Sequence, residues 1–284
     1  MKNNLKNSVL PILDWGRSDI EQRLFFPGGR FTKVNSLLSG LLAVFLTAAF
    51  YGLLSTPWLR GSAVEAIFTQ RGPTQYATAL LFFWCIVILA IKWFKLGFQQ
   101  RALDLRVMPE EAGFVLSTTT VDQVLNRIHE SVDDPRHFIL FNRLLVALAN
   151  LRNLGNVGDV DEILRSQASQ DEAAMDTSYA LLQGFVWAIP VLGFIGTVLG
   201  LSEAIGQFSG VLGASKDVGQ ISAALKGVTA GLATAFDTTL VALLAALIVQ
   251  LLMTVIRKNE EEFLDSAMDY GLKNVVGRLR IARN

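Results

Sequence analysis

Residues 227–256 read GVTAGLATAFDTTLVALLAALIVQLLMTVI, and this stretch decides the fold class of the protein. It is longer than the roughly 20 apolar residues that a helix needs to cross a bilayer, and Arg257 and Lys258 close it. Asp237 is its only charged residue. Because a carboxylate within hydrocarbon is costly, such residues usually face the interior of a helix bundle or an ion pathway. The stretch therefore predicts a membrane helix with one polar face.

Hydroxyl groups surround this acid along the helix. Thr238 and Thr239 follow Asp237 directly, and Thr229 lies two turns earlier. A membrane helix with an acidic, hydroxyl-rich seam indicates the passage of protons or cations. In the alternative reading, Asp237 hydrogen-bonds to a neighbouring helix and does not titrate in function.

Three further segments are long enough to cross a membrane. The first lies within residues 34–59, the second covers about 74–91, and the third begins near Tyr179 and contains LLQGFVWAIPVLGFIGTVLGL. The chain is 51% hydrophobic and 18% charged, and the charged share is below that of soluble domains. These segments predict a multi-pass membrane protein with four spans.

The distribution of basic residues predicts the orientation. Residues 1–33 hold six Lys or Arg, residues 92–106 hold four, and residues 257–284 hold six. The loops between the first two and the last two spans hold two each. Because cytoplasmic loops carry the excess of Lys and Arg, both termini and the long middle connection are expected in the cytoplasm.

The predicted fold class is an all-α integral membrane protein with four transmembrane helices and a helical cytoplasmic domain between spans two and three. Helical patterns cover residues 121–132 and 137–154. No helix breaker separates residues 159–177 from the third span, so a long helix should extend from membrane to cytoplasm. The expected parts are a cytoplasmic N-terminal segment (1–33), a first transmembrane hairpin (34–95), the cytoplasmic domain (96–177), transmembrane helices three and four (178–256) and a cytoplasmic C-terminal helix (257–284).

Several classes of function find no support in these residues. The formal net charge is zero, which gives no electrostatic reason to expect nucleic acid as a partner. Cys85 is the single cysteine and the chain has two histidines, with no spacing typical of a metal site. No catalytic constellation is present, so the chain is expected to be neither an enzyme nor a cofactor-binding protein.

Small residues recur at helical spacing in the last two spans. In lipid, residues of this kind let helix backbones approach closely. Pro190 removes a hydrogen bond from the third span and is expected to give it a hinge. The residues predicted to pack the helices or to contact a partner helix are Gly193, Gly196, Gly200, Gly227, Gly231 and Ala235.

Two motifs resemble a known family. Residues 189–201, IPVLGFIGTVLGL, resemble the signature helix of the MotA/TolQ/ExbB proton-channel proteins, and residues 230–235 are similar to their last membrane helix. The order of two spans, a large cytoplasmic piece and two spans resembles the MotA branch, whereas Gly196-Thr197-Val198 is closer to TolQ and ExbB. The chain resembles a divergent branch, and the anti-phage ZorA proteins are a similar one.

The resemblance implies an ion-conducting, stator-like motor subunit in the bacterial inner membrane. Such subunits form a pentamer around a dimer of a single-span MotB/TolR/ExbD-like partner, whose membrane aspartate takes up and releases ions. The assembly converts ion-motive force into rotation or mechanical work. The resemblance also implies that Thr197 is a pore threonine and that Pro190 serves gating.

The fourth span departs from the family pattern. An ungapped alignment on Gly231 places Val228 where the family has its second pore threonine, so Thr229 or Thr238 is the expected substitute. The same alignment places Asp237 where many relatives have proline. Asp237 then either supplements the partner's aspartate or binds an interhelical donor.

The ion and two other functions stay open at this stage. A proton is the preferred ion, but the hydroxyls of the seam suit Na⁺ as well. Glu203, near the periplasmic end of the third span, attracts cations at an entry or is a solvated interfacial acid. One alternative function is a membrane scaffold that conducts nothing. The other is an ion-coupled transporter subunit, which four spans without inverted repeats make less favoured.

Overall fold

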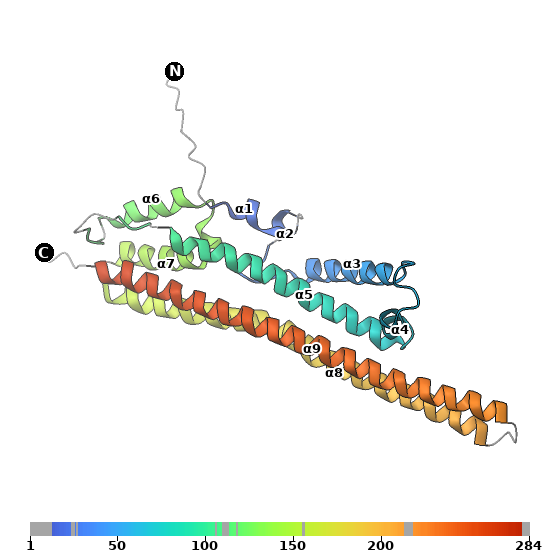
Figure 1. Ribbon diagram of the computed structural model, residues 1–284. Coiled ribbons are helices and arrows are strands. Elements are labelled where there is room, and N and C mark those ends of the chain that lie inside the picture. Colours follow the sequence, from blue (N-terminus) through green and yellow to red (C-terminus); the bar gives the residue numbers. More distant parts are fainter. Residues whose placement is uncertain are drawn as a thin grey trace. The chain divides into compact units, whose positions relative to one another are not determined.

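The fold is described by a computed structural model, which covers residues 13–23, 26, 28–105, 107–109, 114–117, 119–154, 157–212 and 218–279. Residues 1–12 of the predicted N-terminal segment lie outside this range. The described residues are helical apart from connections and two isolated β-bridges, which confirms the all-α class. The elements, shown in Figure 1, are α1 (Trp15–Ser18), α2 (Ile20–Arg23), α3 (Ser36–Leu54), α4 (Ala63–Thr69), α5 (Pro73–Gln100), η1 (Arg101–Asp104), α6 (Val121–Ser131), η2 (Pro135–His137), α7 (Ile139–Leu154), α8 (Val157–Leu212), α9 (Val218–Asn274) and η3 (Val276–Arg278).

The chain divides into two compact units. Three long helices, α5, α8 and α9, contribute residues to both. We call the two units the head unit (Met1–Asn35, Ile91–Ser178 and Ile256–Asn284) and the span unit (Ser36–Ala90 and Tyr179–Val255).

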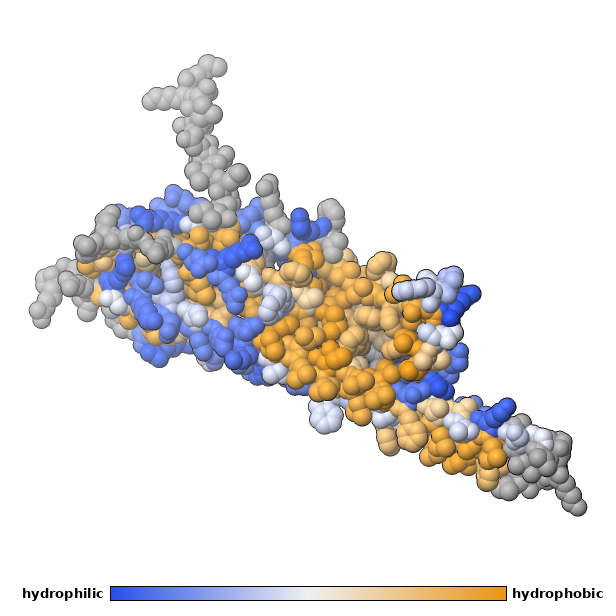
Figure 2. Space-filling model, in the orientation of Figure 1, coloured by the Kyte–Doolittle hydropathy of each residue, from blue (hydrophilic) through white to orange (hydrophobic). Residues whose placement is uncertain are grey.

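Helices α3, α5, α8 and α9 are long and apolar enough to cross a membrane, which confirms the predicted four spans. Large apolar side chains of the span unit are exposed, including Trp187 at 79%, Phe194 at 67% and Phe236 at 71% of their surface. Figure 2 shows apolar residues covering most of the visible surface of this unit. Exposed apolar surface of this extent marks contact with lipid or with other protein. The protein is therefore an integral membrane protein.

The last two spans belong to helices much longer than a bilayer requires. Helix α8 runs without interruption from Val157 to Leu212 and passes through Pro190, which confirms the expected long helix. Pro190 has no N–H, so the carbonyl of Val186, four residues earlier, loses its helical donor. Helix α9 joins the fourth span to the C-terminal tail as one element.

The prediction of a C-terminal helix is wrong for residues 275–279, because α9 ends at Asn274; residues 280–284 lie outside the described range. The short 3₁₀ turn η3 follows, and Leu279 then forms a bridge with Leu116. The Leu116 N–H donates to the Arg278 carbonyl at 2.9 Å. The tail leaves the helix because its backbone groups pair with a separate segment of the head unit.

Helix α4, in the loop after α3, was not predicted. Ser62 accepts a hydrogen bond from the Glu65 N–H at 3.1 Å, and the Glu65 carboxylate accepts one from the Gly61 N–H at 2.5 Å. Ser62-Ala63-Val64-Glu65 has the sequence of a capping box, a local signal that starts a helix even within a short loop; here Glu65 accepts from the Gly61 N–H, one residue before the N-cap Ser62.

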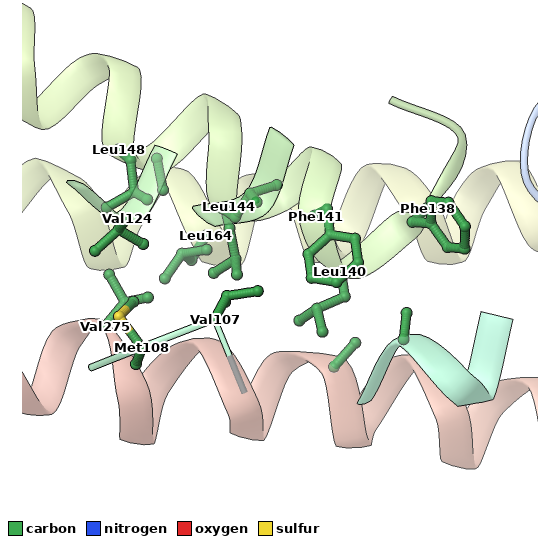
Figure 3. Packing of buried hydrophobic residues seen from close by; sticks show 14 of the residues in the cluster. Val107, Met108, Val124, Phe138, Leu140, Phe141, Leu144, Leu148, Leu164 and Val275 are labelled. Carbon is green, nitrogen blue, oxygen red and sulfur yellow. The ribbon is translucent and has the colours of Figure 1, made fainter. Parts of the chain in front are cut away.

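The head unit has its own hydrophobic core. Apolar side chains from α6, α7, α8 and the segments around Val107 and Val275 meet there, as Figure 3 shows. Helix α7 supplies the largest share, which accounts for the many apolar positions in residues 137–154. Its fully buried members include Leu140, Phe141, Leu144 and Leu148.

Two lysines at the end of the second span are buried in the head unit. The Lys92 ammonium lies 3.2 Å from Glu260, and both side chains are 1% exposed. The Lys95 ammonium lies 2.5 Å from Glu21, which is also buried. A buried charge without a partner is strongly destabilising, so these pairs hold α5 to α9 and to the segment before α3. In the sequence both lysines belong to the basic residues 92–106 that predict a cytoplasmic connection, and nothing there indicated that they are enclosed by protein.

Candidate functional site

In the span unit, α8 and α9 lie side by side and antiparallel (Figure 1). Gly193 faces Ala242 near one end of the contact, and Gly200 faces Gly231 near the other. A methyl group added at Gly200 would lie 2.7 Å from the Gly231 carbonyl oxygen and 2.8 Å from the Ala235 nitrogen. The two backbones therefore approach so closely that only small residues fit.

Gly196 and Gly227 have different neighbours. A methyl group at Gly196 would lie 2.6 Å from the Thr238 hydroxyl oxygen and 2.9 Å from that of Thr74. At Gly227 it would meet only the flexible end of the Gln207 side chain. Gly196 thus brings α5 and α9 against α8, whereas Gly227 lies outside the closest contact.

Replacing Gly200 with alanine should destabilise the helix pair by about 1–3 kcal/mol, because the new methyl would overlap backbone atoms of α9. Gly184→Ala, on the same helix, is the matched control, since no atom lies within 4 Å of the added methyl. Alanine is the better helix former, so the control should be neutral or stabilising. Thermal unfolding in detergent compares the two, and equal stability of both variants would contradict close packing at Gly200.

Thr197 of α8 contacts Thr239 of α9, hydroxyl to hydroxyl, and both side chains are half-buried. The Thr197 hydroxyl also lies 3.2 Å from the carbonyls of Gly193 and Ala235, and the Thr239 hydroxyl lies 3.2 Å from the Gly193 carbonyl. The two hydroxyls therefore lie in the interface of the last two spans, between the tight contacts at Gly193 and Gly200.

This cluster offers more acceptors than protons. Each hydroxyl carries one hydrogen and can rotate, so the pair donates at most two hydrogen bonds among the two carbonyls and its own oxygens. Lone pairs of the Thr197 and Thr239 hydroxyls consequently stay available. Such a pair can accept a hydrogen bond from a protonated acid or contribute oxygen ligands to a cation, and it can reverse its donor direction as the charge passes.

Asp237 pairs with an arginine within the same unit. Its carboxylate lies 2.9 Å from the Arg71 guanidinium, with the two side chains 25% and 22% exposed. Arg71 also donates to the Thr234 hydroxyl at 3.4 Å. Arg71 lies two residues before α5, so the pair connects the start of that helix to α9. Asp237 was expected either to supplement the partner's aspartate or to bind a donor from another helix. The ion pair with Arg71 favours the second role, because a carboxylate that carries ions must exchange its partners.

Polar side chains at the start of α5 extend this cluster. Thr74 and Gln75 are 7% and 1% exposed, and the hydroxyl of Thr74 and the side-chain oxygen of Gln75 have no partner among the described residues. The Nε of Arg71 likewise has no hydrogen-bond partner among the described residues. Buried polar atoms are normally hydrogen-bonded, so their concentration here marks a polar region inside the apolar span unit.

The structure does not bring the other predicted pathway residues together. Thr229 is exposed and donates to the Leu225 carbonyl of its own helix. Thr238 is 1% exposed, and its hydroxyl bonds backward along α9 to the Thr234 and Ala235 carbonyls. Glu203 is exposed beside Gln207.

Sequence reasoning did not single out Thr239 as the partner of Thr197, nor Arg71 as the partner of Asp237. A signal for Thr239 was present, since Thr197 and Thr239 each lie four residues after a small residue of the packing seam, Gly193 and Ala235. Arg71 had no such signal, because it lies in a different loop, far from Asp237 in the chain.

Residues 139–268 match the family model described as MotA/TolQ/ExbB proton channel family. The match begins at α7 and ends within α9, so it includes both helices that carry the threonine pair. No curated protein and no solved structure matches the chain.

Proposed function

Because residues 139–268 match the MotA/TolQ/ExbB proton channel family, we propose that this chain is a member of that family and the ring-forming subunit of an ion-conducting, stator-like complex. The contact between Thr197 and Thr239 carries the proposal. The pair lies within the matched region, in the interface of the last two spans, and presents rotatable hydroxyls with spare lone pairs. Rotatable hydroxyls of this kind suit a polar relay through an apolar helix pair.

In this proposal the pathway depends on a second protein. Asp237, the acid of the fourth span, is held in an ion pair with Arg71, so the exchanging carboxylate comes from a single-span MotB/TolR/ExbD-like partner. The exposed apolar faces of α8 and α9 contact that partner and neighbouring copies of this chain. Five copies surround a partner dimer and convert ion-motive force, carried by protons, into rotation or mechanical work.

The proposed location is the bacterial inner membrane, with both termini in the cytoplasm. The excess of Lys and Arg in residues 1–33, 92–106 and 257–284 supports this orientation. The head unit, which collects these segments, then lies on the cytoplasmic side.

Subunit counting tests the assembly. The chain is coexpressed with a single-span partner that has a membrane aspartate, and the intact complex is weighed by native mass spectrometry. Five copies with two partners support the proposal, and proton uptake by liposomes that contain the complex supports conduction. A partner-free oligomer without proton flux would overturn it.

The scaffold remains the second candidate, because the tight glycine contacts and the Arg71–Asp237 pair are features that serve assembly without conduction. It predicts that loss of the Thr197 hydroxyl changes nothing while a bulkier residue at Gly200 disrupts the complex.

A further inference from the structure

The head unit contains a cavity of about 290 Å³ that the proposed ion pathway does not use. One wall is a face of α8 that includes Gln167, Gln170 and Ser178. A second wall is residues 30–33 of the segment before α3, and α9 contributes Glu260 and Leu264. At about 30 Å³ per water molecule in the liquid, the cavity has room for roughly ten waters, or for a polar group of similar size.

The acids of the cavity already have protein partners. Asp171 lies 2.7 Å from Arg143, and Glu260 pairs with Lys92 and accepts a hydrogen bond from Thr32. All four charged side chains are at least nine-tenths buried. The floor of the cavity is thus close to neutral.

The rim, in contrast, carries positive charge. Arg30 and Lys33 line the cavity and are both exposed. Arg30 uses one amino group to bond Asn142 at 3.1 Å and stacks on the Phe31 ring at 4.6 Å, so its other N–H groups keep donor capacity. The amides of Gln167 and Gln170 add neutral donors. This combination favours an anion with several oxygens.

The segment that presents these cations is held in a strained conformation. Phe31 has φ of 58°, a left-handed value that a bulky residue rarely adopts. Glu21 accepts hydrogen bonds from the N–H groups of Gly29 at 2.8 Å and Asn35 at 2.7 Å, and Lys95 donates to the Lys33 carbonyl at 3.0 Å. Strained backbone held by its surroundings is often found where a ligand is bound.

Chain connectivity places the cavity near lipid headgroups. Lys33 lies three residues before α3, and a chain of three residues spans at most about 10 Å. Ser178 is the last head-unit residue of α8, directly before its span-unit part. Lys33 and Ser178 are therefore within reach of the headgroups of the adjoining leaflet.

We propose that this cavity binds the phosphate of an anionic lipid headgroup, held by Arg30 and Lys33. Basic pockets beside membrane helices are typical sites for anionic lipids. The bound phosphate would join the segment before the first span to α8 and α9. The inference does not depend on ion conduction, so it stands or falls separately from the proposed function.

The test is a native mass spectrometry titration of the detergent-solubilised full chain with phosphatidylglycerol, and with phosphatidylcholine as the neutral lipid. The wild-type chain should retain phosphatidylglycerol in preference to phosphatidylcholine. Lys33→Gln should weaken this binding about fivefold, and Arg30→Gln together with Lys33→Gln about 25-fold, as expected for loss of one and two cations near the membrane surface.

Lys258→Gln is the matched control. Lys258 lies just after the fourth span, its side chain is 73% exposed, and it is not among the cavity residues. Affinity within twofold of wild type is expected. The proposed site would be excluded if Lys258→Gln and Lys33→Gln lost equal affinity for phosphatidylglycerol. It would also be excluded if the wild-type chain retained the two lipids equally. Displacement of the lipid by millimolar inorganic phosphate would keep the anion site and overturn its assignment to lipid.

Discussion

Replacing Thr197 with valine should reduce proton flux through the reconstituted complex by roughly ten- to hundredfold. Valine has nearly the shape of threonine, so the side chain still fills the space between α8 and α9, while the hydrogen bonds of the hydroxyl to the Gly193 and Ala235 carbonyls are lost. The passing charge loses one hydrogen bond of the Thr197–Thr239 pair, which is worth about 1.5–3 kcal/mol for a charged group, and each 1.4 kcal/mol is tenfold. Thr239→Val should have a similar effect.

The measurement is acidification of liposomes that contain the complex and a trapped pH-sensitive dye, driven by a potassium diffusion potential. Thr197→Ser keeps the hydroxyl and should retain most of the flux. Thr254→Val is the control on α9, because the Thr254 side chain is exposed and bonds to the Gln250 carbonyl of its own helix. Wild-type flux in Thr197→Val and Thr239→Val would exclude the pair from the pathway and favour the scaffold.

Removing one member of the Arg71–Asp237 pair should destabilise the span unit by roughly 3 kcal/mol. This value is at the lower end of the range for breaking a buried ion pair, since each side chain keeps about a quarter of its surface exposed. Asp237→Asn leaves the Arg71 guanidinium without its counter-ion, and Arg71→Gln leaves a carboxylate in an apolar span. The double variant, Arg71→Gln with Asp237→Asn, should recover more than half of the loss. Thermal unfolding in detergent measures all three.

Proton flux through complexes of the same variants shows whether Asp237 anchors the helices through Arg71 or carries the conducted ion. If Asp237 is an anchor, the double variant conducts better than either single variant, because it carries no unpaired charge. If Asp237 carries the ion, Asp237→Asn and the double variant both lose conduction, whereas Arg71→Gln retains it. The second pattern would return Asp237 to the ion pathway. It would contradict the structural role that we infer from its ion pair with Arg71.

The sequence was sufficient to predict features that depend on local composition and spacing. Apolar length identified the four spans, and the absence of helix breakers predicted the long helix that is α8. The motif in residues 189–201 pointed to the family that the match over residues 139–268 supports. Such properties are visible because each depends on neighbouring residues in the chain.

The candidate site was only partly predictable. Thr197, Asp237 and the glycines were identified, because a polar or small residue is conspicuous in an apolar run. The choice of Thr229 or Thr238 as the second hydroxyl depended on an alignment along one helix. In the structure, rotation and register of α9 against α8 bring Thr239 to Thr197, leave Thr229 exposed and bury Thr238.

By itself, therefore, the sequence determined that this is an all-α membrane protein with four spans and a polar seam in the last two. Only the tertiary structure decided which polar groups meet. It paired Asp237 with Arg71, enclosed Lys92 with Glu260, and set the rim of Arg30 and Lys33 around a cavity. These partners are far apart in the chain and come together only when helices pack, and one residue's rotation of a helix, about 100°, is enough to change them.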